Sequence, residues 1–160
     1  MEMYTDVMFL IALEMDLPTI LNFCSASKRS YNICKDPSFW GKKLDKDYSE
    51  YKENFNDKNP REKYTLIYKL LKLKKELFLS EDIVTLYNEG ELYLFKKKIK
   101  NIPKEISALT NLGHLLINLK IESIPKELSK LPELQILYVH KNVFVPKEVK
   151  NLPDLKIYYL

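Results

Sequence analysis

The side chains that could perform nucleophilic, acid–base or metal chemistry are few in this chain. It has two histidines, His114 and His140, and neither stands beside a plausible nucleophile in the sequence. Because the whole chain has only 3 glycines, a glycine-rich loop that could hold phosphate groups is not possible. The sequence therefore predicts a protein that is not an enzyme, with no catalytic residue, no cofactor and no metal site.

The two cysteines, Cys24 and Cys34, lie in an apolar region with helical spacing. There is no second pair of cysteines and no histidine nearby, which excludes the usual spacings of zinc sites. Disulfide frameworks are typical of small secreted domains with several cysteines. We therefore expect two reduced thiols in a core.

The charge of the chain is mildly basic, with 26 lysines and arginines against 22 acids and a net charge of +4. Most lysines alternate with glutamates, which is typical of a solvated surface, so we expect neither nucleic acid nor an anionic membrane as a partner. One run, Lys96, Lys97, Lys98 and Lys100, predicts a local basic spot. It leaves nucleic-acid binding open as an alternative.

The only apolar stretch near the N-terminus, residues 7–13, is too short for a membrane span and has acids on both sides. A signal peptide would need a positive start and a longer apolar region. We therefore expect a soluble protein in the cytoplasm, with the nucleus as a second compartment.

A Pro-Lys-Glu tripeptide recurs in the second half of the chain, beginning at Pro103, Pro125 and Pro146. Steps of 22 and 21 residues are typical of a stacked repeat. Aligned on these prolines, apolar residues form columns just before the proline and three, six and nine residues after it. The columns are Ile102, Ile124 and Val145; Ile106, Leu128 and Val149; Leu109, Leu131 and Leu152; and Leu112, Leu134 and Leu155.

Between the prolines lie short alternating stretches with the period of a strand that buries one face. These are Leu92-x-Leu94, Leu115-x-Ile117 and Leu137-x-Val139. Strand, turn and a short return segment resemble the leucine-rich-repeat family over residues 86–160, which implies a short solenoid with a parallel sheet. The units are 89–111, 112–133 and 134–154, with a final strand at 155–160. The asparagine of the family pattern is kept at Asn142, replaced by Lys97 in the first unit, and displaced to Asn118 or replaced by Lys120 in the second.

In that family the strand residues between the buried leucines line the binding face, so the resemblance implies three columns of exposed residues. They are Glu91, His114, Ile136 and Ile157; Tyr93, Leu116, Tyr138 and Tyr159; and Phe95, Asn118 and His140. All except Ile157 are expected to contact a protein target, because exposed tyrosines are frequent at binding hot spots. The alternative is that the tyrosines pack on one another across neighbouring strands.

The first 47 residues have helical spacing and predict three short helices. Thr5 or Asp6 is expected to cap the first, and Asp16 the second, with Pro18 in its first turn. A polar step at residues 25–29 follows, and Asp36 begins a further turn. Val7, Leu10, Ile11 and Met15 are expected to share one side of the first helix. Ile20, Leu21 and Phe23 follow in the second, and an apolar group follows the polar step at Tyr31, Ile33 and Cys34. Phe39, Trp40 and Leu44 are expected to point inward. So small a unit leaves apolar surface for the rest of the chain or for a partner.

This segment resembles an F-box, the helical module that binds the Skp-type adaptor of cullin-based ubiquitin ligases. The matching residues are Asp6-Val7, Leu17-Pro18-x-Ile20-Leu21, Ser27-Lys28-Arg29 and Asp36-Pro37-Ser38-Phe39-Trp40. The chain departs from the family at Met3-Tyr4, where Leu-Pro is usual, and at Leu17, where proline is more common. The resemblance implies adaptor contacts from Tyr4, Val7, Leu17, Pro18, Ile20, Leu21 and Lys28.

An F-box followed by leucine-rich repeats resembles the substrate receptors of SCF-type ubiquitin ligases, and short versions with this composition are similar to proteins of giant DNA viruses. The resemblance implies a Skp-type adaptor, a cullin bound through it, and an unknown protein target as partners. For a viral protein the compartment is the host cytoplasm. The alternative is a leucine-rich-repeat interaction protein without a ubiquitin role, whose first helices only cap the repeats.

Residues 48–85 are predicted to connect the helical module, 1–47, to the repeats, 86–160. A helical pattern runs from Arg61 to Phe78. We expect this helix to separate the two modules, to cap the exposed edge of the first repeat, or both. At the other end, the final strand leaves an apolar edge, which predicts weak self-association, contact with a partner, or a fragment.

Overall fold

The computed structural model describes residues 2–96 and 98–160, and side chains from residue 7 onward. The chain is a mixed α+β protein whose strands form one parallel sheet of four. It divides into two compact units, residues 1–68 and 69–160, and the boundary falls inside helix α5, Pro60–Glu76. We call them the helical unit and the sheet unit. The finer division into 1–47, 48–85 and 86–160 stays a prediction.

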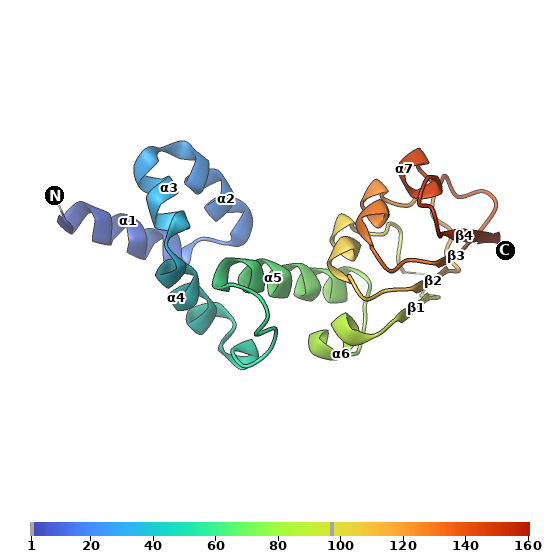
Figure 1. Cartoon of the computed structure of the whole chain (residues 1–160), viewed down its shortest axis with the longest axis horizontal. Coiled ribbons are helices and arrows are strands. Elements are labelled where there is room, and N and C mark those ends of the chain that lie inside the picture. The colour runs from blue at the N-terminus through green and yellow to red at the C-terminus, as the bar shows by residue number, and fades with distance from the viewer. Residues whose placement is uncertain (1, 97) are drawn as a thin grey trace. The chain divides into compact units, whose positions relative to one another are not determined.

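The helical unit holds four α-helices before α5, not three (Figure 1). Ser27 explains the difference, because it ends one helix and caps the next within the polar step of residues 25–29. The elements are α1 (Glu2–Glu14), α2 (Leu17–Ala26), α3 (Lys28–Lys35), α4 (Pro37–Asp47) and the 3₁₀ turn η1 (Ser49–Tyr51).

Side-chain caps set the starts of the three helices after α1. Asp16 accepts a hydrogen bond from the Thr19 amide at 3.0 Å, and Pro18 lies in the first turn of α2, as predicted. Ser27 forms a reciprocal capping box with Ser30, and Asp36 accepts from the Ser38 amide at 2.8 Å. The prediction for α1 was wrong, because this helix begins at Glu2, before Thr5 and Asp6.

The core of the helical unit is a chain of aromatic contacts. Phe9 meets Phe39 edge-on at 5.3 Å, Phe39 meets Trp40 at 5.2 Å, and Trp40 meets Tyr64 of α5 at 5.5 Å between ring centroids. Lys43 is also buried, and its Nζ donates to the Leu13 carbonyl at 2.6 Å and lies 2.6 Å from Asp47 Oδ2. The last carbonyls of α1 and the carboxylate therefore satisfy this buried charge.

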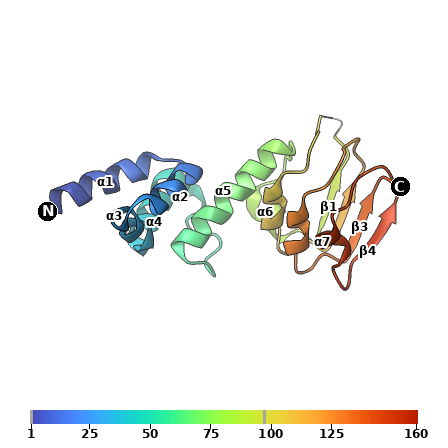
Figure 2. The same cartoon turned by 90° about the horizontal axis from the view of Figure 1, so that it is seen from above.

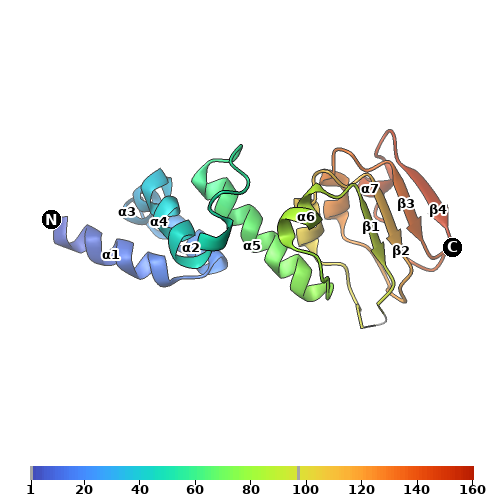
Figure 3. The same cartoon turned by 90° about the horizontal axis from the view of Figure 1, so that it is seen from below.

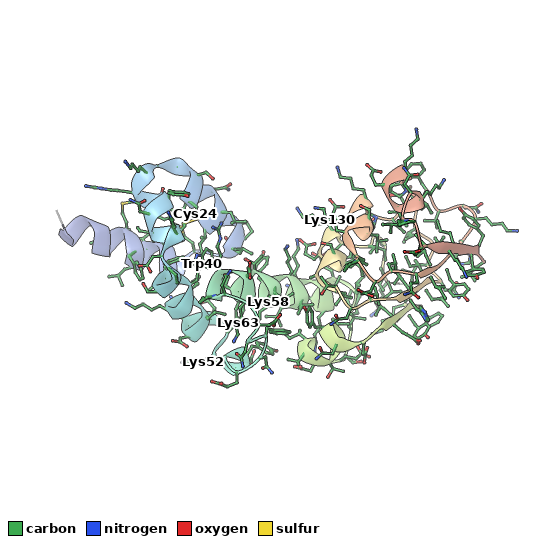
Figure 4. The ribbon with its side chains drawn as sticks, viewed as in Figure 1. Cys24, Trp40, Lys52, Lys58, Lys63 and Lys130 are labelled. Atoms are coloured by element: carbon green, nitrogen blue, oxygen red, sulfur yellow. A yellow bond between two sulfur atoms is a disulfide. The ribbon has the colours of Figure 1, made fainter. Side chains whose placement is uncertain are left out.

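Cys24 and Cys34 form a disulfide, so the prediction of reduced thiols was wrong (Figure 4). The short turn between α2 and α3 packs these helices together and places the two Cα atoms 5.7 Å apart, within reach of a disulfide. Sequence separation alone does not reveal this approach. The Cys34 carbonyl also accepts a hydrogen bond from Trp40 Nε1 at 2.7 Å.

In the sheet unit, four parallel strands lie in chain order, each joined to the next by a short helical return (Figures 2 and 3). The returns lie over one face of the sheet, and the other face has no helix over it. The elements are α6 (Ile83–Asn88), β1 (Glu91–Leu94), η2 (Lys104–Ala108), β2 (His114–Ile117), η3 (Lys126–Lys130), β3 (Ile136–Val139), α7 (Lys147–Lys150) and β4 (Lys156–Tyr159).

The predicted apolar columns form the core of this unit, except that Leu152 and Leu155 at its end are only partly buried. Pro103, Pro125 and Pro146 each occupy the position before a helical return, and the residues on both sides of each Pro-Lys-Glu step are buried. Proline suits this place because its φ is preset and no amide is needed. Ile106, Leu128 and Val149 are fully buried.

The register of the last strand differs from the prediction. Lys156 pairs with Ile136, Ile157 with Leu137, Tyr158 with Tyr138, and Tyr159 with Val139. The columns with Ile157 beside Ile136 and Tyr159 beside Tyr138 were therefore wrong by one residue. β2 and β3 each follow a Leu-x-x-Leu spacing, Leu112 to Leu115 and Leu134 to Leu137, whereas the spacing at β4 is one residue shorter, from Leu155 to Ile157. Because side chains alternate between faces, this missing residue turns Tyr158 to the exposed face and Tyr159 to the other.

Candidate protein-binding surfaces

The first candidate surface lies on α1 of the helical unit. Val7, Leu10 and Ile11 are 50%, 61% and 52% exposed and, at helical spacings of three and four, share one side of the helix. The three residues share one side of the helix, as predicted, and that side is exposed, whereas the inward side carries Phe9 and the buried Ala12. We call Val7, Leu10 and Ile11 the α1 stripe.

The residues that the F-box resemblance assigns to adaptor binding are placed in different environments. Leu17 and Ile20 are buried in the core, at 4% and 0% exposure, and therefore cannot touch a partner in this conformation. Pro18, Leu21 and Lys28 are exposed. Val7 belongs to the α1 stripe, whereas the side chain of Tyr4 lies outside the described residues. Leu10 and Ile11 are exposed apolar residues of α1 that the adaptor-binding prediction did not include.

The second candidate surface is the uncovered side of the sheet, which we call the sheet face. Its columns follow from the register and contain Tyr158 in place of Tyr159. Tyr93, Phe95 and Tyr158 are 52%, 55% and 45% exposed. The columns are Glu91, His114, Ile136 and Lys156; Tyr93, Leu116, Tyr138 and Tyr158; and Phe95, Asn118, His140 and Leu160.

Polar contacts order one end of the sheet face. The Tyr93 hydroxyl donates a hydrogen bond to Glu91, and His114 Nδ1 lies 3.2 Å from Glu91 Oε1. The hydrogen bond from Tyr93, with help from His114, lowers the pKa of Glu91 below its ordinary value. The same hydrogen bond raises the pKa of Tyr93. Glu91 is thus held as a carboxylate, and Tyr93 as a neutral phenol, at neutral pH.

Aromatic and polar pairs also cross the sheet face. Tyr138 stacks on Tyr158 with ring centroids 5.0 Å apart, and Tyr93 stacks on Phe95 at 6.4 Å. The alternative that tyrosines pack across strands therefore holds for Tyr138, whose partner is Tyr158. Near the ends of the strands, His140 Nε2 and Asn118 Oδ1 lie 2.8 Å apart.

Hollows of opposite charge lie at the two ends of the sheet face. At the amino ends of the strands, a pocket of about 480 Å³ contains Glu91 and Glu133. At the carboxyl ends, pockets of about 460 and 540 Å³ share Lys120 and His140, and the larger also contains Lys141 and Glu122. We call them the acidic pocket and the basic pockets.

Within the described part of the chain, no group of three or more histidine, cysteine or acidic side chains could hold a metal ion. No helix among the same residues is both long and apolar enough to cross a membrane. The chemistry that the two surfaces offer is apolar contact, aromatic stacking and charge pairing.

No family model matches this chain, and no curated protein matches it significantly.

Proposed function

We propose that this chain is a substrate-recognition subunit of an SCF-type E3 ubiquitin ligase. In this proposal the helical unit is an F-box-like module that binds a Skp-type adaptor, and through it a cullin. The sheet unit is a short leucine-rich-repeat solenoid whose sheet face binds a protein target. Residues 48–85 connect the two modules and cap the first repeat, and the protein acts in the cytoplasm or the nucleus.

The α1 stripe is the observation that carries the adaptor part of this proposal. Three large aliphatic side chains on one helix side are about half exposed, although the same unit buries Phe39 and Trp40 completely or almost so. Exposed apolar clusters of this kind are typical of protein-binding surfaces. The target part is supported by the exposed aromatic residues of the sheet face, since tyrosine is enriched at binding hot spots.

The burial of Leu17 and Ile20 favours a second candidate function. If the F-box resemblance in α2 reflects only core packing, the chain is a non-catalytic protein-interaction protein without a ubiquitin role. Both functions use the sheet face, and only the first requires the α1 stripe to bind an adaptor.

The test is the affinity of the full chain for a purified Skp-type adaptor, measured by calorimetry. We expect Val7→Asp/Leu10→Asp to weaken binding at least about 30-fold, because truncating hot-spot residues costs about 2 kcal/mol or more. Leu17→Asp is unsuitable, because a buried charge would unfold the unit.

The matched control is Phe144→Asp, which places an acid at an apolar residue that is 64% exposed in the sheet unit. It should bind the adaptor as the unchanged chain does. A folded full chain without measurable adaptor binding would contradict the ligase function and leave the second candidate.

A further inference from the structure

Charge is distributed unevenly between the two ends of the sheet unit. Among the described residues, the three loops that follow β1, β2 and β3 contain five lysines and a single acid, Glu122. The segments that lead into the strands carry Glu89, Glu133 and Asp154, and Glu91 begins β1, so four acids stand at this end against one lysine, Lys156, which begins β4. The basic and acidic pockets are the places where these two charge groups border the sheet face.

The arrangement of the exposed side chains indicates where a ligand would be held. Lys120 and Lys141 are exposed and lie beside His140 and Phe95 at the basic pockets. Glu91, at the opposite end, is kept ionised by Tyr93. Between them the middle column offers tyrosine and leucine side chains for apolar contact. A partner that matches this face has separated charges with an apolar part between them.

We propose that the sheet face binds a charge-separated peptide segment whose acidic end lies at the basic pockets and whose basic end lies at the acidic pocket. This inference rests on the proposed function only in taking the sheet face as the target-binding surface. From Glu91 to Phe95 the strand advances about 13 Å, at about 3.3 Å a residue. The opposite charges of the peptide are thus about four residues apart if it is extended, or about nine if it is helical.

The acidic pocket argues against nucleic acid as the occupant. A phosphate backbone carries negative charge along its whole length, so a strand lying on the basic pockets and crossing the face would meet Glu91 and Glu133. Complementary charge at both ends selects a partner and its orientation, and increases the rate of association. A peptide that carries both charges can pair with the lysines of the basic pockets and with the glutamates of the acidic pocket at the same time.

The test is a selection of random displayed peptides on the full chain, without an adaptor. We expect enriched peptides to carry an acidic cluster and a basic residue at one of these two separations. The variant Lys120→Glu/Lys141→Glu should bind them at least about tenfold more weakly, since charge reversal replaces attraction by repulsion. The matched control, Lys126→Glu/Lys130→Glu, makes the same charge change on exposed residues of η3, where Figure 4 labels Lys130, and should bind them normally.

Three outcomes would overturn the proposal. One is the enrichment of neutral or basic peptides, or of none, on the folded chain. Another is unchanged binding of acidic peptides to Lys120→Glu/Lys141→Glu. The third is tight binding of single-stranded oligothymidine that this variant abolishes, which would assign the basic pockets to nucleic acid. Because no adaptor is present, the result is independent of the adaptor test, and either proposal can fail alone.

Discussion

At the scale of single residues, Phe78 has a left-handed backbone conformation, with φ of 53°, which glycine adopts more readily than any other residue. It follows the last turn of α5, where the Leu79 amide donates to the Lys74 carbonyl at 2.9 Å and the Phe78 amide to the Lys75 carbonyl at 3.3 Å. This pair of bonds is a Schellman motif, which satisfies the last carbonyls of a helix and usually places glycine at this position. The ring of Phe78 is half exposed.

We therefore expect Phe78→Gly to be more stable than Phe78→Ala by about 1 kcal/mol, measured by urea unfolding. Both changes remove the ring, but only glycine adopts the left-handed conformation without steric strain. Leu71→Gly and Leu71→Ala, inside α5, serve as the control pair and should show the opposite order. An alanine variant at residue 78 as stable as the glycine variant would contradict this account.

At the scale of elements, an ion pair with one buried partner, Glu105, ties α5 to the first helical return of the sheet unit. Lys72 Nζ lies 2.8 Å from Glu105 Oε1, and the side chain of Glu105 is only 8% exposed. Lys72 also lies 3.8 Å from Glu76, one turn later on α5. The Pro-Lys-Glu step of the first repeat thus provides the acid that holds the end of α5.

Lys72→Met should destabilise the sheet unit by about 1–2 kcal/mol, because it leaves a buried carboxylate without its ammonium partner. This loss is smaller than the cost of breaking a fully buried ion pair, because Lys72 is 37% exposed and water can reach the carboxylate. The double change Lys72→Met/Glu105→Leu removes the unpaired charge. It should be more stable than Lys72→Met alone in denaturant titrations, and equal stability would show that the unpaired Glu105 carboxylate has no cost.

The same pair predicts a dependence on pH. Burial by itself raises the pKa of Glu105. The hydrogen bond from Lys72, a backbone hydrogen bond and the charges of Lys72 and Lys104 together outweigh burial, so the pKa lies below the ordinary value. A lowered folded pKa gives stability that is present above the unfolded pKa and is lost as the pH falls through the folded pKa. The stability difference between the unchanged chain and Glu105→Gln should therefore be present at neutral pH and disappear in strong acid. A difference that persists there would show that ionisation of Glu105 is not its source.

Strands and returns were predictable from the sequence because each depends on local alternation. Leu115 and Ile117 bury one face of a strand, and Pro125 marks the start of the next return, so spacing alone located them. The register of β4 was not predictable from the repeat, because the spacing shortens by one residue between Leu155 and Ile157 and only pairing with β3 shows the shift. Tyr158 was missed on the sheet face for this reason.

Helix packing was harder to predict than helix position. Asp16 and Pro18 correctly located the start of α2, but α1 is apolar on several sides, so spacing did not show which side faces the core. The disulfide was missed because it depends on how α2 and α3 pack. The inward side of α1 and the disulfide both depend on how helices pack against one another, which local helix propensity does not determine.

At the scale of the whole molecule, the chain forms two compact units, and the disulfide belongs to only one of them. Cys24 and Cys34 lie in the helical unit, which is small and has a limited apolar core. A disulfide stabilises such a unit mainly by restricting its unfolded chain. Its effect should therefore be local.

We expect Cys24→Ala/Cys34→Ala to lower the stability of the helical unit by about 2–3 kcal/mol, the range typical of a short disulfide loop. In hydrogen exchange, amides of α2 and α3 should exchange faster, while those of β2 and β3 should not change. Before any change, the denatured and unreduced protein should have no free thiol. Free thiols, or faster exchange in both units, would contradict the prediction.

Trp40 has a practical consequence for experiments on this protein. It is the only tryptophan in the chain, is 1% exposed, lies under the guanidinium of Arg61, and donates to the carbonyl of the disulfide-bonded Cys34. Its fluorescence therefore reports on the helical unit and is silent about the sheet unit. Emission excited selectively at tryptophan would follow the unfolding or reduction of the first unit, whereas a probe of the second must be introduced by substitution.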